Sequence, residues 1–193
     1  GREILDDGTP ISVQIIIDES TARVRIRAPR SDGNLNAPRA VARAALLYVF
    51  RCLVEEPLPL NEGALRPFTI DIEPGGLFWP EPPAAVAGGN VESSQRLVDA
   101  LLAALGVQAA SQGTMNNLTI GTRTGTVYET IGGGSGATRT SAGTDAVQVH
   151  MTNTPATDVE ELEHRVPILL ESWKIRRGSG GAGKFGGGNG VEK

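Results

Sequence analysis

The sequence predicts an α+β fold, built from a mixed or antiparallel sheet, two main helices and long glycine-rich loops. The expected strands and helices separate into runs more than they alternate, which argues against a doubly wound sheet. Glycine is concentrated late in the chain, with 10 of the 25 glycines before position 121 and 15 from there on. We therefore expect ordinary packed structure early in the chain and a larger share of loops later.

Composition limits the class of protein. The 193 residues suit one ordinary domain or two small ones, and 39% apolar residues allow a core. With 18 Lys and Arg against 22 Asp and Glu, the net charge of −4 argues against nucleic-acid binding. The single cysteine excludes an internal disulfide and a cysteine-rich zinc module. No apolar run approaches the ~18 residues that span a bilayer, and the start lacks a signal-peptide layout. We expect a soluble, cytoplasmic chain with no membrane contact.

Two β-branched runs, residues 11–17 and 22–27, predict a hairpin. In the second run, Val24 and Ile26 alternate with three arginines, so the arginines share the opposite face. Such a row can hold an anionic ligand, but a solvated outer face of an antiparallel sheet is the stronger expectation. Residues 68–72 predict a further strand after a turn-rich connection.

Two helices are expected in the first part of the chain. Asn36 is of the residue type that caps a helix, and the apolar segment from there to Val54 predicts a mostly buried helix. Cys52 lies inside it and is expected to be a small core residue. A second, amphipathic helix is expected to start near Asn90 and to end at Gly106.

The second part of the chain predicts shorter elements. Residues 127–131 and 146–149 indicate strands, residues 159–164 a short acidic helix, and residues 168–175 another strand. We expect a single α+β domain over residues 1–177. Residues 178–193 then form a glycine-rich tail or loop.

Two glycine-rich segments imitate nucleotide-binding motifs. Residues 178–184 match most of a phosphate-binding loop, but Phe185 replaces the required Ser or Thr and more glycines replace the helix that should follow. Residues 132–137 imitate the start of a dinucleotide fingerprint without the surrounding βαβ unit. Both segments are better interpreted as places where backbones approach closely.

Candidate site residues come from the polar side chains. His150 follows a short predicted strand among polar neighbours, whereas His164 belongs to an ion-paired helix face. Neutral amide and hydroxyl side chains suit a polar, amide-like ligand, although they serve equally well to satisfy loop backbone. The residues concerned are Asn90, Gln112, Asn116, Asn117, Asn153 and Thr154.

Several of these stretches resemble the hydantoinase B/oxoprolinase family, the B-type subunits of ATP-dependent N-methylhydantoin and 5-oxoproline hydrolases and of related ketone carboxylases. The matching motifs include Asn-Glu-Gly at 61–63 and His-Met-Thr-Asn-Thr at 150–154. The agreement runs in order and with similar spacing through residues 34–38, 59–63, 83–95, 110–117, 128–134 and 150–154. It is more specific than any single motif described above.

The resemblance implies a division of labour. An A-type ATPase partner activates the substrate carbonyl by phosphorylation, and the B-type subunit completes hydrolysis or carboxylation. ATP and a divalent metal are expected in the complete complex, and neither is assigned to this chain. The family's metal-binding segment lies upstream of everything present here, so the chain resembles the C-terminal part of an oligomeric subunit and is expected to be inactive alone.

The sequence thus predicts a part in ATP-dependent hydrolysis of a cyclic amide, of the N-methylhydantoin or 5-oxoproline type. His150 and Asn153 are expected to polarise or orient the substrate, and Glu129 to act as an acid or base. Two alternatives stay open. In the first, the chain is a non-catalytic domain that docks subunits; in the second, it is part of a related ATP-dependent ketone carboxylase.

Overall fold

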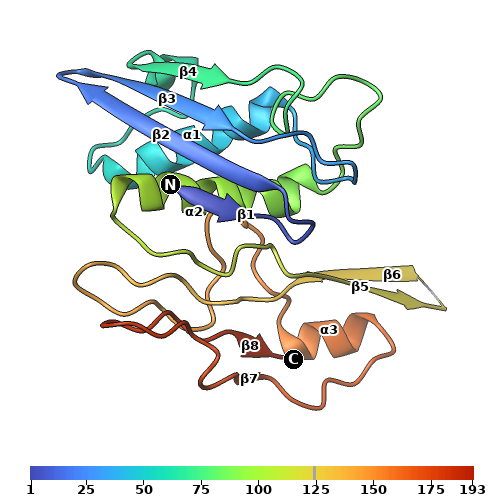
Figure 1. Cartoon of the computed structure of the whole chain (residues 1–193). Coiled ribbons are helices and arrows are strands. Elements are labelled where there is room, and N and C mark those ends of the chain that lie inside the picture. Colours follow the sequence, from blue (N-terminus) through green and yellow to red (C-terminus); the bar gives the residue numbers. More distant parts are fainter. Residues whose placement is uncertain (124) are drawn as a thin grey trace. The chain divides into compact units, whose positions relative to one another are not determined.

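The computed structural model describes residues 1–123 and 125–193, and its contacts divide the chain into two compact units (Figure 1). Unit 1 is Gly1–Gln108 and unit 2 is Ala109–Lys193. Helices and mixed or antiparallel sheets occur together, so the predicted α+β class is confirmed. None of the helices in the described ranges is both long enough and apolar enough to cross a bilayer.

Unit 1 contains a four-stranded mixed sheet in the order β1-β2-β3-β4. The strands are β1 (Arg2–Ile4), β2 (Pro10–Asp18), β3 (Thr21–Arg27) and β4 (Phe68–Ile72). β1, β2 and β3 pair antiparallel, and β4 pairs parallel to β3. The predicted hairpin and the predicted strand at 68–72 are both confirmed.

The two α-helices of unit 1, α1 (Arg39–Leu53) and α2 (Ser94–Leu105), lie on one face of this sheet (Figure 1). The unit also contains the 3₁₀ turn η1 (Glu62–Leu65) and the π-helical turn η2 (Gly89–Ser93). α2 packs against β1 and β2, and α1 packs against α2. Gly106 ends α2 in the left-handed conformation, at φ 64°, as expected for a glycine cap.

The core of unit 1 forms between the inner sheet face and these helices. Val24 and Ile26 on β3 are fully buried, as are Leu97 and Leu101 on α2. The arginines of β3 lie on the other face, where Arg27 pairs with Asp71 on β4 at 2.7 Å. The hydrogen bond from Arg27 lowers the pKa of Asp71. This row is therefore an exposed, partly ion-paired sheet face.

Three expectations for α1 are wrong: its N-cap residue, its burial on most sides and the burial of Cys52. Pro38, not Asn36, is the N-cap, and Asn36 is fully buried. The Asn36 side chain accepts from the Ser31 N–H at 2.9 Å and donates to the Ala85 carbonyl at 3.2 Å, so it joins two loops. Cys52 is exposed because α1 buries one face only, and Cys52 lies outside that face. The buried residues of α1 are Val41, Ala42, Ala45, Leu46 and Val49.

Unit 2 contains two small antiparallel pairs and one helix. β5 (Asn117–Thr122) pairs with β6 (Gly125–Thr130), and β7 (Lys174–Ile175) pairs with β8 (Val191–Glu192). α3 (Val159–Arg165) matches the predicted acidic helix, and the Asp158 carboxylate caps it by accepting from two backbone N–H groups. The sequence did not predict β5, whose polar first residues hide its alternation.

Two strand predictions in unit 2 need correction. Residues 146–149 form no strand, because Ala146 adopts φ 55° and donates its N–H to the Asn189 carbonyl at 2.8 Å. Of the predicted strand at 168–175, only β7 forms. Before β7, the Ile168 N–H donates to the Val166 carbonyl at 2.8 Å and the Leu170 N–H donates to the Glu163 carboxylate at 2.7 Å, so these groups pair locally and form no ladder.

Glycine backbone fills much of unit 2. The Gly188 N–H donates to the Ser135 carbonyl at 2.8 Å, and the Gly143 N–H donates to the Gly186 carbonyl at 2.9 Å. A Cβ atom added at Gly188 would lie 2.0 Å from the Thr144 carbonyl oxygen. The backbones of unit 2 therefore approach one another closely, because no side chain separates them.

Candidate functional site

Three of the predicted polar residues of unit 2, Gln112, Asn116 and Asn117, lie near the open end of the β5–β6 hairpin. Asn117 at the start of β5 is the ladder partner of Thr130 at the end of β6. Asn116, at φ 48°, exchanges two hydrogen bonds with Ile131: its side-chain Nδ2 donates to the Ile131 carbonyl, and its own carbonyl accepts from the Ile131 N–H, both at 3.1 Å. The amide residues thus anchor the chain where β6 passes into the glycine loop.

Gln112 likewise bonds to backbone groups, in this case next to the glycine loop that follows β6. Its Nε2 donates to the Thr114 carbonyl at 2.6 Å, and its Oε1 accepts from the Gly133 N–H. A Cβ atom at Gly133 would lie 2.4 Å from the Cβ of Gln112, so only glycine fits beside this side chain. The bonds of Gln112 and Asn116 to backbone groups match the scaffolding interpretation of the amide residues.

Thr130 connects the hairpin to the segment that carries His150. The Gln148 Nε2 donates to both the carbonyl and the Oγ1 of Thr130, at 3.0 Å each. The Thr130 Oγ1 donates to the Thr154 carbonyl at 3.3 Å. Sequence reasoning missed Thr130 and Gln148. The density of amides and hydroxyls was the available signal, but Gln148 fell within an expected strand.

Two buried acceptors in this cluster are unsatisfied. In the part of the chain that the structure describes, the Asn117 Oδ1 and the Gln148 Oε1 are buried and have no hydrogen-bond partner. Buried polar atoms nearly always have a protein or water partner, so each such atom requires an explanation. Both atoms belong to residues that flank Thr130.

His150 is held in an unusual backbone conformation. It is buried, at 9% exposure, and has φ 53°, in the left-handed region that non-glycine residues rarely adopt. The turn over residues 149–152 is closed by the Thr152 N–H, which donates to the Val149 carbonyl at 3.0 Å. Such a conformation costs of order 1 kcal/mol and persists only where neighbouring contacts hold it.

Glu129 lies beside Thr130 in a buried ion pair. Its Oε2 accepts from the Lys193 Nζ at 3.1 Å and from the Thr157 N–H at 3.3 Å, and Lys193 also lies 4.7 Å from the Trp173 ring centroid. Burial opposes ionisation, but the hydrogen bonds from Thr157 and Lys193 outweigh it and lower the pKa of Glu129. The carboxylate is therefore ionised at neutral pH. Lys193 carries no sequence signal that predicts this pairing.

The remaining predicted residues are not part of this cluster. Asn153 and Thr154 have exposed side chains, and only the Thr154 backbone joins the network. Asn90 is exposed on η2 and belongs to unit 1. His164 is exposed on α3, as expected for a solvated helix face.

The described residues do not fit a metal ion or a nucleotide. Within residues 1–123 and 125–193, no group of three or more His, Cys, Asp and Glu side chains is placed to hold a metal. No helix follows Lys184, whose ammonium group lies 5.6 Å from the Phe185 ring centroid.

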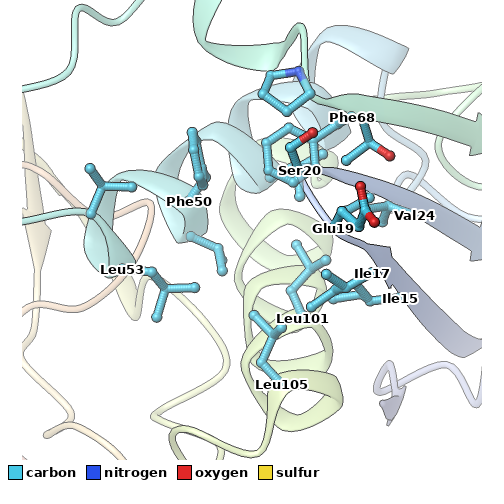
Figure 2. Close-up of a pocket in the computed structure, with 16 residues that line it drawn as sticks. Ile15, Ile17, Glu19, Ser20, Val24, Phe50, Leu53, Phe68, Leu101 and Leu105 are labelled. Carbon is cyan, nitrogen blue, oxygen red and sulfur yellow. The ribbon is translucent and has the colours of Figure 1, made fainter.

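Each unit also contains a cavity. In unit 2, a cavity of about 200 Å³ is lined by glycine backbone together with Ser111, Gln112 and Phe185. In unit 1, a larger apolar cavity of about 370 Å³ lies between the C-terminal parts of α1 and α2 and the strands β2 to β4 (Figure 2). Phe50, Phe68 and Leu101 line it, and it contains none of the predicted site residues.

A family model and individual relatives point to the same family. A family model described as hydantoinase B/oxoprolinase matches residues 1–193. The chain is 47% identical over 194 residues to 5-oxoprolinase 1 of Arabidopsis thaliana and 45% identical over 193 residues to 5-oxoprolinase of Dictyostelium discoideum. Each alignment covers 98% of this chain, which spans 15% of the length of each relative.

Two solved structures share the fold. An ATP-dependent caprolactamase from Pseudomonas jessenii matches with a TM-score of 0.80 at 24% identity, over 99% of this chain and 37% of that one. A nucleotide-free acetone carboxylase matches with a TM-score of 0.80 at 17% identity, over 95% of this chain and 27% of that one. At these identities the likeness concerns the fold alone.

Proposed function

This chain belongs to the hydantoinase B/oxoprolinase family, and on that premise we propose that it forms the C-terminal part of a subunit that hydrolyses a cyclic amide with ATP. The substrate is of the 5-oxoproline or N-methylhydantoin type. The proposal is supported most directly by 45–47% identity to proteins named 5-oxoprolinase over nearly the whole chain. A cytoplasmic location accords with the use of ATP.

The partner in this proposal is an A-type ATPase subunit or domain. It transfers a phosphoryl group from ATP to the amide oxygen, which converts a resistant carbonyl into one with a phosphate leaving group. Water then adds to the carbon, the ring C–N bond breaks as the nitrogen takes up a proton, and a second water hydrolyses the resulting acyl phosphate to a carboxylate and phosphate. Activation of this kind lowers the barrier of the hydrolytic step. The present chain contributes residues that orient the substrate and no ATP site.

His150 is the residue proposed to polarise or orient the substrate. The carrying observation is its conformation: a buried histidine at φ 53° inside the His-Met-Thr-Asn-Thr motif. Strained residues of this kind cluster at functional sites. Asn153, three residues later and exposed, is proposed to assist in orientation.

The test is turnover of 5-oxoproline and ATP by the complete protein with its partner. His150→Asn keeps a residue that tolerates the left-handed conformation but removes the imidazole, and we expect kcat/KM to fall about 100-fold. The matched control is His164→Ala, since His164 is exposed on α3. Unchanged kcat/KM in His150→Asn would remove His150 from the site.

Glu129 is proposed as a base or a positioning carboxylate. Its lowered pKa favours the ionised form, which accepts a proton more readily than it donates one. Glu129→Gln should reduce kcat across the whole pH range if the charge is required. A change confined to stability would assign Glu129 to the ion pair with Lys193 alone.

A non-catalytic docking role is the second candidate. The observation that favours it is the apolar cavity of unit 1, whose lining residues Ile17 and Leu53 are 67% and 47% exposed (Figure 2). The proposed occupant is an apolar segment of the A-type partner. Ile17→Asp should then abolish co-purification of the partner, whereas normal co-purification would reject this role.

A further inference from the structure

We propose that Thr130 is a positioning residue that holds the loop over residues 148–154, and with it His150, in the shape needed for catalysis. Gln148 is the second member of this device. The inference rests on the proposed function, because it gives His150 its role. It adds two residues, Thr130 and Gln148, that no motif assigned.

The first argument is that one residue holds both ends of the loop. Gln148 at its start donates to the Thr130 carbonyl and Oγ1, each at 3.0 Å. Thr154 at its end accepts from the Thr130 Oγ1 at 3.3 Å. Thr130 is itself fixed at the end of β6 and is only 4% exposed. The loop is therefore closed around a buried, immobile residue.

The second argument is that the hydrogen bonds can run in one direction only. A backbone carbonyl can only accept, so the Gln148 nitrogen must face Thr130. The Thr130 hydroxyl must donate to the Thr154 carbonyl for the same reason, which leaves its lone pairs free for Gln148. The Gln148 Oε1 then has to point away from Thr130, and it is buried without a partner. The unsatisfied Oε1 is therefore a consequence of the orientation in which the Gln148 Nε2 anchors the loop to Thr130.

The third argument is that His150 needs such an anchor. It lies between the two tethered ends, at φ 53°, where an unrestrained histidine would return to negative φ. The Thr152 N–H donates to the Val149 carbonyl and closes a short turn around His150. The bonds of Thr130 to Gln148 and Thr154 join this turn to the end of β6. Displacement of a positioning group by about 1 Å costs on the order of 100-fold in rate.

The decisive variant is Thr130→Val, which keeps the side-chain shape and removes the hydroxyl. In the complete protein with its partner, we expect kcat for 5-oxoproline to fall at least about tenfold while KM changes little. Thr130→Ser, which restores the hydroxyl, should return kcat to within about twofold of wild type. The matched control is Thr126→Val, the same substitution at an exposed position of β6.

Gln148→Met tests the same device if Thr130→Val does not fold. Gln148 is partly exposed, and its replacement leaves the bond between Thr130 and Thr154 in place. We expect a smaller fall in kcat, about threefold or more, since one of two anchors is lost. The double variant should lose clearly less than the product of the two single losses, because both residues act on one loop, and a fully multiplicative loss would mean that they act independently.

The outcomes separate this inference from the proposed function. Wild-type protein without ATP-dependent turnover of any cyclic amide would reject the proposed function. A defect in His150→Asn together with normal kcat in Thr130→Val and Gln148→Met would overturn the present inference alone. A fall in kcat that Thr130→Ser does not restore would also overturn it, because the hydroxyl would then not be the cause.

Discussion

Unit 1 and unit 2 differ in what fills their interiors. Among the described residues, nearly all buried apolar side chains belong to unit 1, and only Val149 and Leu162 belong to unit 2. Unit 2 packs glycine backbone against glycine backbone, as at Gly143 and Gly186, and adds side-chain bonds to carbonyls and N–H groups. The proposed site lies in the unit with few apolar side chains.

This difference shows that the two units hold their shape in different ways. Apolar packing is non-directional and tolerates exchange of volume between neighbours. Hydrogen-bonded backbone contacts are directional, so they fix a loop such as 148–154 in one geometry. The five predictions that follow test this contrast, in order of decreasing expected effect, with the pH dependence placed after the ion pair to which it belongs.

The largest effect is expected from a cavity in unit 1. Leu97 is fully buried on α2, and Leu97→Ala should lower the free energy of unfolding of unit 1 by about 4 kcal/mol. Hydrogen exchange of residues 1–108 in the complete protein measures it. The control is Leu60→Ala, at a side chain that is 70% exposed. A loss below about 1 kcal/mol would show that unit 1 does not depend on its apolar core.

Breaking the buried ion pair of unit 2 comes next. Lys193→Met leaves the Glu129 carboxylate buried and unpaired, and should cost about 3 kcal/mol at neutral pH. The matched control is Lys174→Met, because Lys174 pairs with Glu192 at the same 3.1 Å distance but in solvent. Hydrogen exchange of residues 125–193 compares the two variants.

The pH dependence of this pair has a defined sign. The pKa of Glu129 is lower in the folded chain than in the unfolded one, so its contribution to stability is complete above the unfolded value. It is lost as the pH falls through the lowered folded value. The difference in free energy of unfolding between wild type and Lys193→Met should therefore shrink in acid. A difference that does not change with pH would contradict the assignment of the ion pair.

A smaller effect is expected from a single methyl group in the glycine contacts. Gly188→Ala places a Cβ atom 2.0 Å from the Thr144 carbonyl oxygen and should cost unit 2 about 2 kcal/mol. Gly181→Ala is the control, since no atom lies within 4 Å of its added Cβ. Equal exchange rates in the two variants would mean that the glycine contacts do not hold unit 2 together.

The smallest effect concerns the exposed face of α1. Cys52→Ala should change the stability of unit 1 by less than about 0.5 kcal/mol, because the side chain is exposed. A maleimide reagent should label this thiol in the native protein at the rate of an accessible cysteine. Protection from the reagent would restore the sequence-based expectation of a buried residue.

The sequence predicted unit 1 better than unit 2 for a physical reason. Alternation and helical periodicity record burial of side chains, so they located the β2–β3 hairpin, β4 and α2. The same signals say nothing about backbone that packs without side chains, and the strand expected at 146–149 failed for that reason. Asn36 misled in another way, since its side chain serves a loop junction and not the helix that follows.

The residue types of the candidate site could be proposed from the sequence, but the connections between them could not. His150, Asn116, Asn117 and Glu129 were proposed from motif position and polarity, and their roles stay predictions. The bonds of Thr130 to Gln148 and Thr154 join residues 18 and 24 positions apart, and no local pattern encodes them. The partner of Glu129, Lys193, lies 64 positions away.

The glycine contacts of unit 2 have a thermal consequence. The heat capacity of unfolding arises mainly from apolar surface that becomes hydrated, typically about 12–15 cal/mol/K per residue. A unit that buries little apolar side-chain surface exposes little of it on unfolding. The heat capacity of unfolding of unit 2, per residue, should therefore fall below that range. Its stability would then vary less with temperature than that of unit 1, and cooling would weaken the apolar core before it weakened the loops that carry His150.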